Sequence, residues 1–288
     1  MFDDLLLHPR TKLQLTNFLS KPSHGVILTG PEGSGKRTLA TALSCGLLNI
    51  SRGAKLADYP YYSELNPEGS SITIDEIRSL QKLLTLKTPI GKRGNLRRVI
   101  TILDAQRMQT EAQNALLKNL EEPPLDTVII LTASGGNLLP TIYSRLQTIE
   151  VLPVSQEMAV TYFASRGVGA AKLAGSYALS QGQAGLLSTL LNDEEHLLKN
   201  WVTIAKQLIG GSLSERLIKA DELGKDKGGL KYLIDALQRI AHAALGKASL
   251  EGNKVAVQRW RKIMTKVQDT SQAYDNNANP KLLLDDLF

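Results

Sequence analysis

The stretch GPEGSGK at residues 30–36 constrains the fold of this chain more than any other feature. It directly follows the short apolar run HGVILTG and directly precedes KRTLATALSCGLLN, whose apolar residues recur at helical spacing. A glycine-rich loop of the form G-x-x-x-x-G-K between a strand and a helix is a phosphate-binding loop, in which backbone N–H groups and the lysine contact phosphates. The residues that we expect around a nucleotide are Gly30, Pro31, Glu32, Gly33, Ser34, Gly35, Lys36, Arg37 and Thr38.

Further apolar runs follow at 98–104 and 127–134, each a candidate buried strand. LLPTIYSRLQTIEV then gives a short helix and a strand that reaches Val151. Amphipathic helical patterns separate them, including ITIDEIRSLQKLLTLK, where Thr73 and Glu76 have the spacing of a capping box. Strands that alternate with helices predict a parallel sheet covered on both faces, with ligands at the carboxyl ends of the strands. We therefore expect an α/β domain over residues 1–153, followed by a chain with only helical patterns.

Composition excludes some functions and compartments. No apolar run is long enough to cross a bilayer, and the first residues carry acids where a secretory signal has bases, so we expect a cytoplasmic protein with no membrane partner. The single cysteine, Cys45, falls on an apolar helical face and is expected to pack there. The histidines are scattered and suggest no metal-ligand set.

The net charge of +6 favours polyanion partners, and much of it lies in two clusters. Each cluster could be a solvated face or a contact with the DNA backbone. The first consists of Lys87, Lys92, Arg93, Arg97 and Arg98, and the second, on a predicted helix, of Lys254, Arg259, Arg261, Lys262 and Lys266.

The catalytic parts of the nucleotide site depart from those of a hydrolysing ATPase. Arg37 stands where a hydroxyl would ligate magnesium, and Thr38 is one residue late. Asp104 ends a predicted strand and is the candidate magnesium ligand, but Ala105 follows it where hydrolysing AAA+ ATPases place the glutamate that prepares water. Gln106 is nearby without an evident substitute role. We expect weak or structural ATP binding and no significant ATPase activity in the isolated chain.

Four blocks, in order and spacing, resemble the delta-prime subunits of bacterial DNA polymerase III clamp loaders. They are PYYSELNPEGSSITIDEIRSLQKLL, ILDAQRMQTEAQNALLKNLEEPP, SRLQTIEV and the terminal NNANPKLLLDDLF. The resemblance implies an AAA+ P-loop domain at 1–153, a small helical lid at 154–192 and an all-helical collar at 193–288. It also implies a hetero-pentamer with gamma/tau and delta subunits, which places a sliding clamp on primed-template DNA during replication, in the bacterial cytoplasm at the nucleoid.

In this resemblance Arg145, in SRLQ, is the arginine that completes the ATP site of a neighbouring motor subunit. Leu146 replaces a cysteine that is common at the next position. On spacing alone Arg145 could instead pair with an acid such as Glu150. Gly185 falls near the place where motor subunits have a phosphate-sensing arginine, and Thr132 and Ser134 fall in the sensor region of the third strand. The segment NISRGAKLADYPYY lacks the cysteines of the family's zinc module, so no zinc is expected.

Two alternatives stay open. The chain could be an ATP-hydrolysing gamma/tau-type motor or a related AAA+ remodelling ATPase, with Thr38 and Gln106 in modified roles. It could also be a small-molecule P-loop enzyme such as a kinase. The long helical half and the absence of a substrate-acid constellation count against the kinase.

Overall fold

The computed structural model describes residues 2–51, 55–67, 69, 71–85, 98–124, 126–212, 227–275, 278, 279 and 283. The chain forms two compact units. The first contains residues 1–162 and 182–186, and the second contains residues 163–181 and 187–288. The predicted division into three domains at 153 and 192 is not tested by these units and stays a proposal.

The first unit is built on a five-stranded sheet in the order β2-β3-β4-β1-β5. All neighbouring strands are parallel, as the alternation of strands and helices predicted. The strands are β1 (Gly25–Thr29), β2 (Tyr62–Leu65), β3 (Arg98–Ile102), β4 (Thr127–Ala133) and β5 (Gln147–Glu150). Every residue of β3 and β4 is buried, as expected for central strands with helices on both faces.

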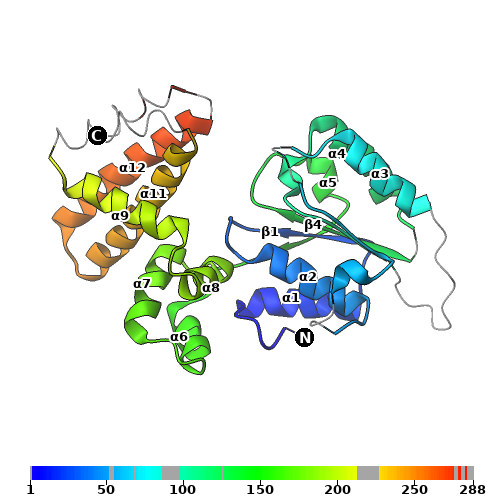
Figure 1. Cartoon of the computed structure of the whole chain (residues 1–288), viewed down its shortest axis with the longest axis horizontal. Coiled ribbons are helices and arrows are strands. Elements are labelled where there is room, and N and C mark those ends of the chain that lie inside the picture. Colours follow the sequence, from blue (N-terminus) through cyan, green and yellow to red (C-terminus); the bar gives the residue numbers. More distant parts are fainter. Residues whose placement is uncertain are drawn as a thin grey trace. The chain divides into compact units, whose positions relative to one another are not determined.

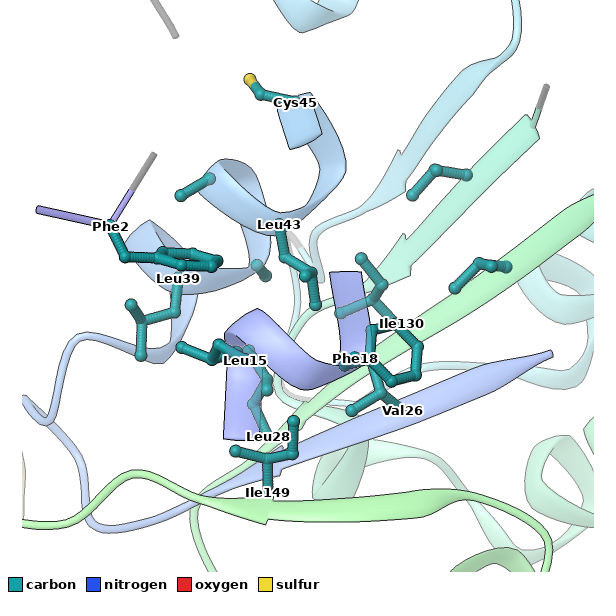
Figure 2. Packing of buried hydrophobic residues seen from close by; sticks show 14 of the residues in the cluster. Phe2, Leu15, Phe18, Val26, Leu28, Leu39, Leu43, Cys45, Ile130 and Ile149 are labelled. Carbon is teal, nitrogen blue, oxygen red and sulfur yellow. The ribbon is translucent and has the colours of Figure 1, made fainter. Parts of the chain in front are cut away.

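Helices cover both faces of this sheet (Figure 1). Alternate residues of one strand supply the two cores, so that Val26 and Leu28 enter one cluster and Ile27 the other. The first cluster includes side chains of α1 (Pro9–Ser20) and α2 (Lys36–Leu47), and the second those of α3 (Ile74–Thr85), α4 (Thr110–Glu121) and α5 (Pro140–Tyr143). Figure 2 shows the first cluster, where Leu15 and Phe18 of α1 lie against the strands.

Two local predictions are confirmed. Cys45 is fully buried in the first cluster. The capping box at the start of α3 is present: the backbone N–H of Thr73 donates to Glu76 over 2.7 Å, and the N–H of Glu76 donates to the Thr73 hydroxyl over 3.4 Å.

After β5 the described chain is helical, in agreement with the sequence patterns. The helices are α6 (Gln156–Ala164), α7 (Ala170–Ser180), α8 (Ala184–Asn192), α9 (Leu197–Gly210), α11 (Lys227–Leu250) and α12 (Lys254–Asp275). In the second unit α11 packs against α7, α9 and α12. Arg239 joins two of these helices, because its guanidinium donates to Asp235 on α11 and to the Leu179 carbonyl on α7, each over 2.9 Å. Within the described ranges no helix is both long and apolar enough to cross a membrane.

Candidate functional site

The glycine-rich loop lies between β1 and α2. Gly30, Gly33 and Gly35 have φ values of 150°, 83° and 96°, a backbone region that residues with a Cβ rarely adopt. Gly35 is also the residue that caps α2. The glycines of the motif are therefore required by the path of the backbone, which turns sharply from the strand into the helix.

Lys36 is buried, with 6% of its surface exposed. Its ammonium group donates to the carbonyl oxygens of Gly30 over 2.9 Å and Pro31 over 2.8 Å. Burial lowers the pKa of Lys36, and the negative charges of Asp104 and Glu32 act in the opposite direction. The lysine thus points into its own loop, within the electrostatic reach of two acids.

Arg37 points away from the loop, toward the edge strand β2. Its Nη2 lies 3.0 Å from Oε1 of Glu64, whose other oxygen accepts a 2.6 Å hydrogen bond from the hydroxyl of Tyr62. Burial and this bond raise the pKa of Tyr62. Thr38 and Arg37 line a pocket whose other walls are Thr41, Ala42 and Cys45. Arg37 therefore interacts with β2 through its charge, which is a role that the motif alone did not reveal.

The carboxyl ends of β3 and β4 meet, as parallel strand ends should. The backbone N–H of Asp104 donates to the hydroxyl of Thr132 over 2.9 Å, with Asp104 itself at φ 49°. Gln106 bridges the two strand ends, since its Nε2 lies 3.4 Å from Asp104 Oδ1 and its Oε1 accepts the N–H of Ser134 over 3.1 Å. Ala105 is fully buried beside them.

Gly185 lies against the glycine-rich loop. A Cβ built on it would be 2.8 Å from the carbonyl oxygen of Gly33 and 2.9 Å from the backbone N of Gly35. In the sequence, Gly185 was of interest only because it falls near the place where motor subunits have a phosphate-sensing arginine. The direct contact with the loop was not expected.

Arg145 follows α5 and keeps 31% of its side-chain surface exposed. Its Nη1 donates to the carbonyl oxygen of Thr141 over 2.9 Å, and its Nη2 lies 2.5 Å from Oε1 of Glu121. Arg145 therefore does pair with an acid, as the alternative reading allowed, but the acid is Glu121 at the end of α4 and not Glu150 of β5. The acidic partner comes from a segment 24 residues away in the sequence.

Gln113 of α4 is a further residue of this region that sequence reasoning missed. It is 3% exposed, and its amide nitrogen donates to the carbonyl oxygens of Met108 over 3.0 Å and Asn137 over 2.8 Å. Its amide oxygen accepts the N–H of Leu139 over 2.8 Å. One side chain therefore joins the turn after β3 to the segment that leads into α5.

The first basic cluster needs a correction. Arg98 is 6% exposed, and its Nη1 donates to the carbonyl oxygen of Leu83 over 2.7 Å, so it holds α3 to β3 and presents no surface charge to DNA. The other members of that cluster, Lys87, Lys92, Arg93 and Arg97, lie outside the described residues. The second cluster falls on α12, as predicted, with Lys254, Arg259, Arg261, Lys262 and Lys266 all exposed.

Candidate metal ligands do not gather in the part of the chain that the structure describes. No three of its histidine, cysteine, aspartate and glutamate side chains form a group that could hold an ion.

The parallel sheet with the glycine-rich loop after β1 and an acid at the end of β3 defines an α/β P-loop fold of the AAA+ class. The chain belongs to the family described as DNA polymerase III, delta subunit, whose model matches residues 8–155. The resemblance is thereby confirmed for the first three sequence blocks, which lie within the matched residues. The terminal block, NNANPKLLLDDLF, lies beyond residue 155 and mostly outside the described residues.

Curated relatives agree with this family. The DNA polymerase III subunit delta' of Haemophilus influenzae is 31% identical over 157 residues, which cover 50% of this chain and 47% of the relative. The corresponding subunit of Pseudomonas aeruginosa is 34% identical over 43% of this chain and 41% of its own length. That of Escherichia coli is 30% identical over 62% of this chain and 56% of its own. The chain thus spans about half the length of the curated relatives it matches.

Among solved structures, a DNA polymerase III gamma subunit-related protein from Thermotoga maritima is similar in fold. The TM-score is 0.59 at 21% sequence identity, over 96% of this chain and 97% of that one. The likeness therefore extends over both compact units and supports the AAA+ fold with an all-helical C-terminal region.

Proposed function

We propose that this chain acts as the delta-prime subunit of a bacterial DNA polymerase III clamp loader. The family match over residues 8–155 is the observation that carries the proposal, and relatives named as delta' subunits support it. In this role the chain joins gamma/tau and delta subunits in a hetero-pentamer that opens a sliding clamp and places it on primed-template DNA. The setting is the bacterial cytoplasm, at the nucleoid.

The chain's own nucleotide site is proposed to bind ATP weakly and to turn it over negligibly. Lys36 and the backbone of the glycine-rich loop would hold the phosphates, and Asp104 is the residue that would hold magnesium. Three aids to hydrolysis are missing. Arg37, which pairs with Glu64, stands in place of the hydroxyl that would ligate magnesium. Ala105 carries no carboxylate to prepare water, and Gly185 has no side chain to sense phosphate. Because one transition-state interaction is worth about 3–4 kcal/mol, losing even one of them slows hydrolysis strongly.

Arg145 is proposed to complete the ATP site of a neighbouring subunit. A guanidinium aimed at the γ-phosphate stabilises the charge that builds up there during phosphoryl transfer. The support is local: Arg145 sits at a turn, partly exposed, and is oriented by Glu121 and by the carbonyl oxygen of Thr141. An arginine that is oriented before a neighbour arrives loses little side-chain entropy on contact.

A gamma/tau-type motor is the second candidate. The subunit tau of Bacillus subtilis is 26% identical over 175 residues, and the lysine of the glycine-rich loop is present. This candidate requires ATP hydrolysis by the isolated chain, abolished by Lys36→Ala.

Reconstitution tests the proposal. The chain is mixed with the gamma/tau and delta subunits of its own loader, and assembly is followed by size-exclusion chromatography and clamp loading on primed DNA. We expect a complex that loads the clamp only when this chain is included. A chain that neither enters the complex nor supports loading would refute the clamp-loader role, whatever its affinity for nucleotide.

A further inference from the structure

Residues 182–186 cover the glycine-rich loop. This segment groups with the first compact unit, although the helical residues before and after it, 163–181 and 187–288, form the second. The backbone N–H of Leu186 donates to the carbonyl oxygen of Gly33 over 2.7 Å. The first turn of α8 is therefore hydrogen-bonded to the middle of the loop.

The contact requires glycine on both sides. A Cβ at Gly185 would lie 2.8 Å from Gly33 O and 2.9 Å from both N and Cα of Gly35, distances that real Cβ atoms do not show. These are backbone atoms, which cannot rotate aside. A Cβ at Gly33 would in turn lie 2.8 Å from the Cβ of Leu186, and Gly33 already has φ +83°. The two segments are interlocked through their main chains.

Nucleotide phosphates need the same backbone. In a phosphate-binding loop the N–H groups of the loop and the lysine ammonium contact the phosphate oxygens. Here Gly185 packs on Gly35, and the ammonium of Lys36 is bonded to the carbonyl oxygens of Gly30 and Pro31. Gly185 thus covers the backbone of the loop, and the ammonium of Lys36 is bonded to the loop's own carbonyl oxygens, so both groups that would contact phosphate are engaged.

The closed arrangement also carries a cost. The Oε1 of Gln183 is buried and has no hydrogen-bond partner among the described residues, and a buried unpaired acceptor destabilises the state that contains it. Lys36 is a buried cation whose hydrogen-bond partners in the loop are neutral oxygens. Asp104 and Glu32 act on Lys36 only through space. A phosphate group would give its ammonium a directly bonded anionic partner, which favours the open arrangement when nucleotide is present.

We propose that residues 182–186 are an intramolecular cover that competes with nucleotide phosphates for the loop, and that Gly185 is the residue that lets the cover close. The inference rests on the assignment of residues 30–36 to nucleotide, which is part of the proposed function. It does not depend on the clamp-loader role. Weak binding of ATP then has a physical cause in the chain's own α8, separate from the missing catalytic groups.

The test compares Gly185→Ala with the wild-type chain in binding a fluorescent ATP analogue, by anisotropy, with magnesium present. One methyl group at residue 185 destabilises the closed state and leaves Lys36 and the loop intact, so we expect about fivefold to 150-fold tighter binding, the range that overpacking costs correspond to. Gly175→Ala is the matched control, because a Cβ at Gly175 in α7 meets nothing within 4 Å. Its binding should equal that of the wild type.

A second measurement uses the unchanged chain. Hydrogen exchange at the Leu186 amide should speed up when ATP is added, because phosphate displaces the cover and breaks the bond to Gly33. If Gly185→Ala is folded by circular dichroism and binds no tighter than the wild type, the cover is not the barrier. If that variant does not fold, exchange decides: a Leu186 amide that stays equally protected with ATP bound overturns the proposal. Both measurements use the isolated chain, so a negative result would refute the cover without bearing on the clamp-loader role that the reconstitution experiment tests.

Discussion

The Nη2 atom of Arg145 lies 2.5 Å from Oε1 of Glu121, so the residue that ends α4 holds the arginine that follows α5. The Nη1 atom is occupied as well, by the carbonyl oxygen of Thr141 at 2.9 Å. A planar guanidinium that is bonded through both terminal nitrogens has a fixed orientation. The orientation of Arg145 is therefore fixed by residues of its own chain.

Removal of this arginine should damage a site on another subunit. Arg145→Ala is expected to reduce turnover at the neighbour's ATP site by about 10³-fold or more, the range measured for arginine fingers. Lys36→Ala should leave the ATPase activity of the reconstituted loader nearly unchanged. The measurement is the DNA-stimulated ATPase rate of complexes that contain each variant. The opposite ranking of the two variants would mean that the chain hydrolyses its own ATP.

Glu121→Gln tests whether orientation of the arginine matters. The substitution keeps the shape of the side chain and removes the charge, and partly exposed pairs contribute at most about 1 kcal/mol. We therefore expect about a twofold to fivefold lower kcat for the loader, with the KM for ATP unchanged. Glu122→Gln, one residue further on, is the matched control. Equal activity of Glu121→Gln and the wild type would show that Arg145 needs no partner.

Arg37→Thr restores a hydroxyl at the position after the lysine, yet it should not create an ATPase. Ala105 and Gly185 remain, so two further aids to hydrolysis are still absent. Loss of the ion pair with Glu64 should cost less than about 1 kcal/mol of stability, because Arg37 is largely exposed. Phosphate release by the isolated variant is the measurement. Turnover that Lys36→Ala abolishes would show that Arg37 alone had blocked hydrolysis.

The first basic cluster can be tested for DNA contact with the buried Arg98 left in place. Joint replacement of Lys87, Lys92, Arg93 and Arg97 by alanine should weaken DNA binding by the loader and reduce its salt dependence. Each lost phosphate contact lowers the log–log slope by about 0.9. An unchanged slope would remove these residues from the DNA interface.

Arg98→Ala should behave differently from the joint replacement of the other members of the cluster. It leaves the carbonyl oxygen of Leu83 without its donor and opens a gap beside β3, so the free energy of unfolding should fall by about 2–3 kcal/mol. Urea denaturation of the isolated chain measures this. A loss below about 0.5 kcal/mol would show that the buried guanidinium contributes little to stability.

Much of the fold could be predicted because its signals are local. Buried strands such as β4 appear as continuous apolar runs, and the loop glycines are recognised by their spacing. The edge strand β2, YSEL, was missed because it has few apolar residues and is only partly buried. The helix α1 was also missed, although Pro9 at its first position and the cap by His8 are recognisable start signals.

The contacts that shape the site were less predictable, for a different reason. Glu121 and Arg145 are 24 residues apart, so their spacing does not predict the ion pair. Gly33 contacts Gly185 through backbone atoms, so the residue types do not predict that contact either. The prediction for Arg98 failed because charge was taken as a sign of exposure. An arginine whose guanidinium finds a buried carbonyl oxygen can lie inside the protein.

Gln113 has a mechanical consequence. The Nε2 of its planar amide donates both to Met108, in the turn that follows Asp104, and to Asn137, and its Oε1 accepts from Leu139, in the segment that leads to α5 and Arg145. Neither segment can shift by a bond length without breaking a hydrogen bond in a buried place, where no water replaces it. The turn after β3 and the segment before Arg145 are therefore mechanically coupled, and the amide of Gln113 is the group that couples them.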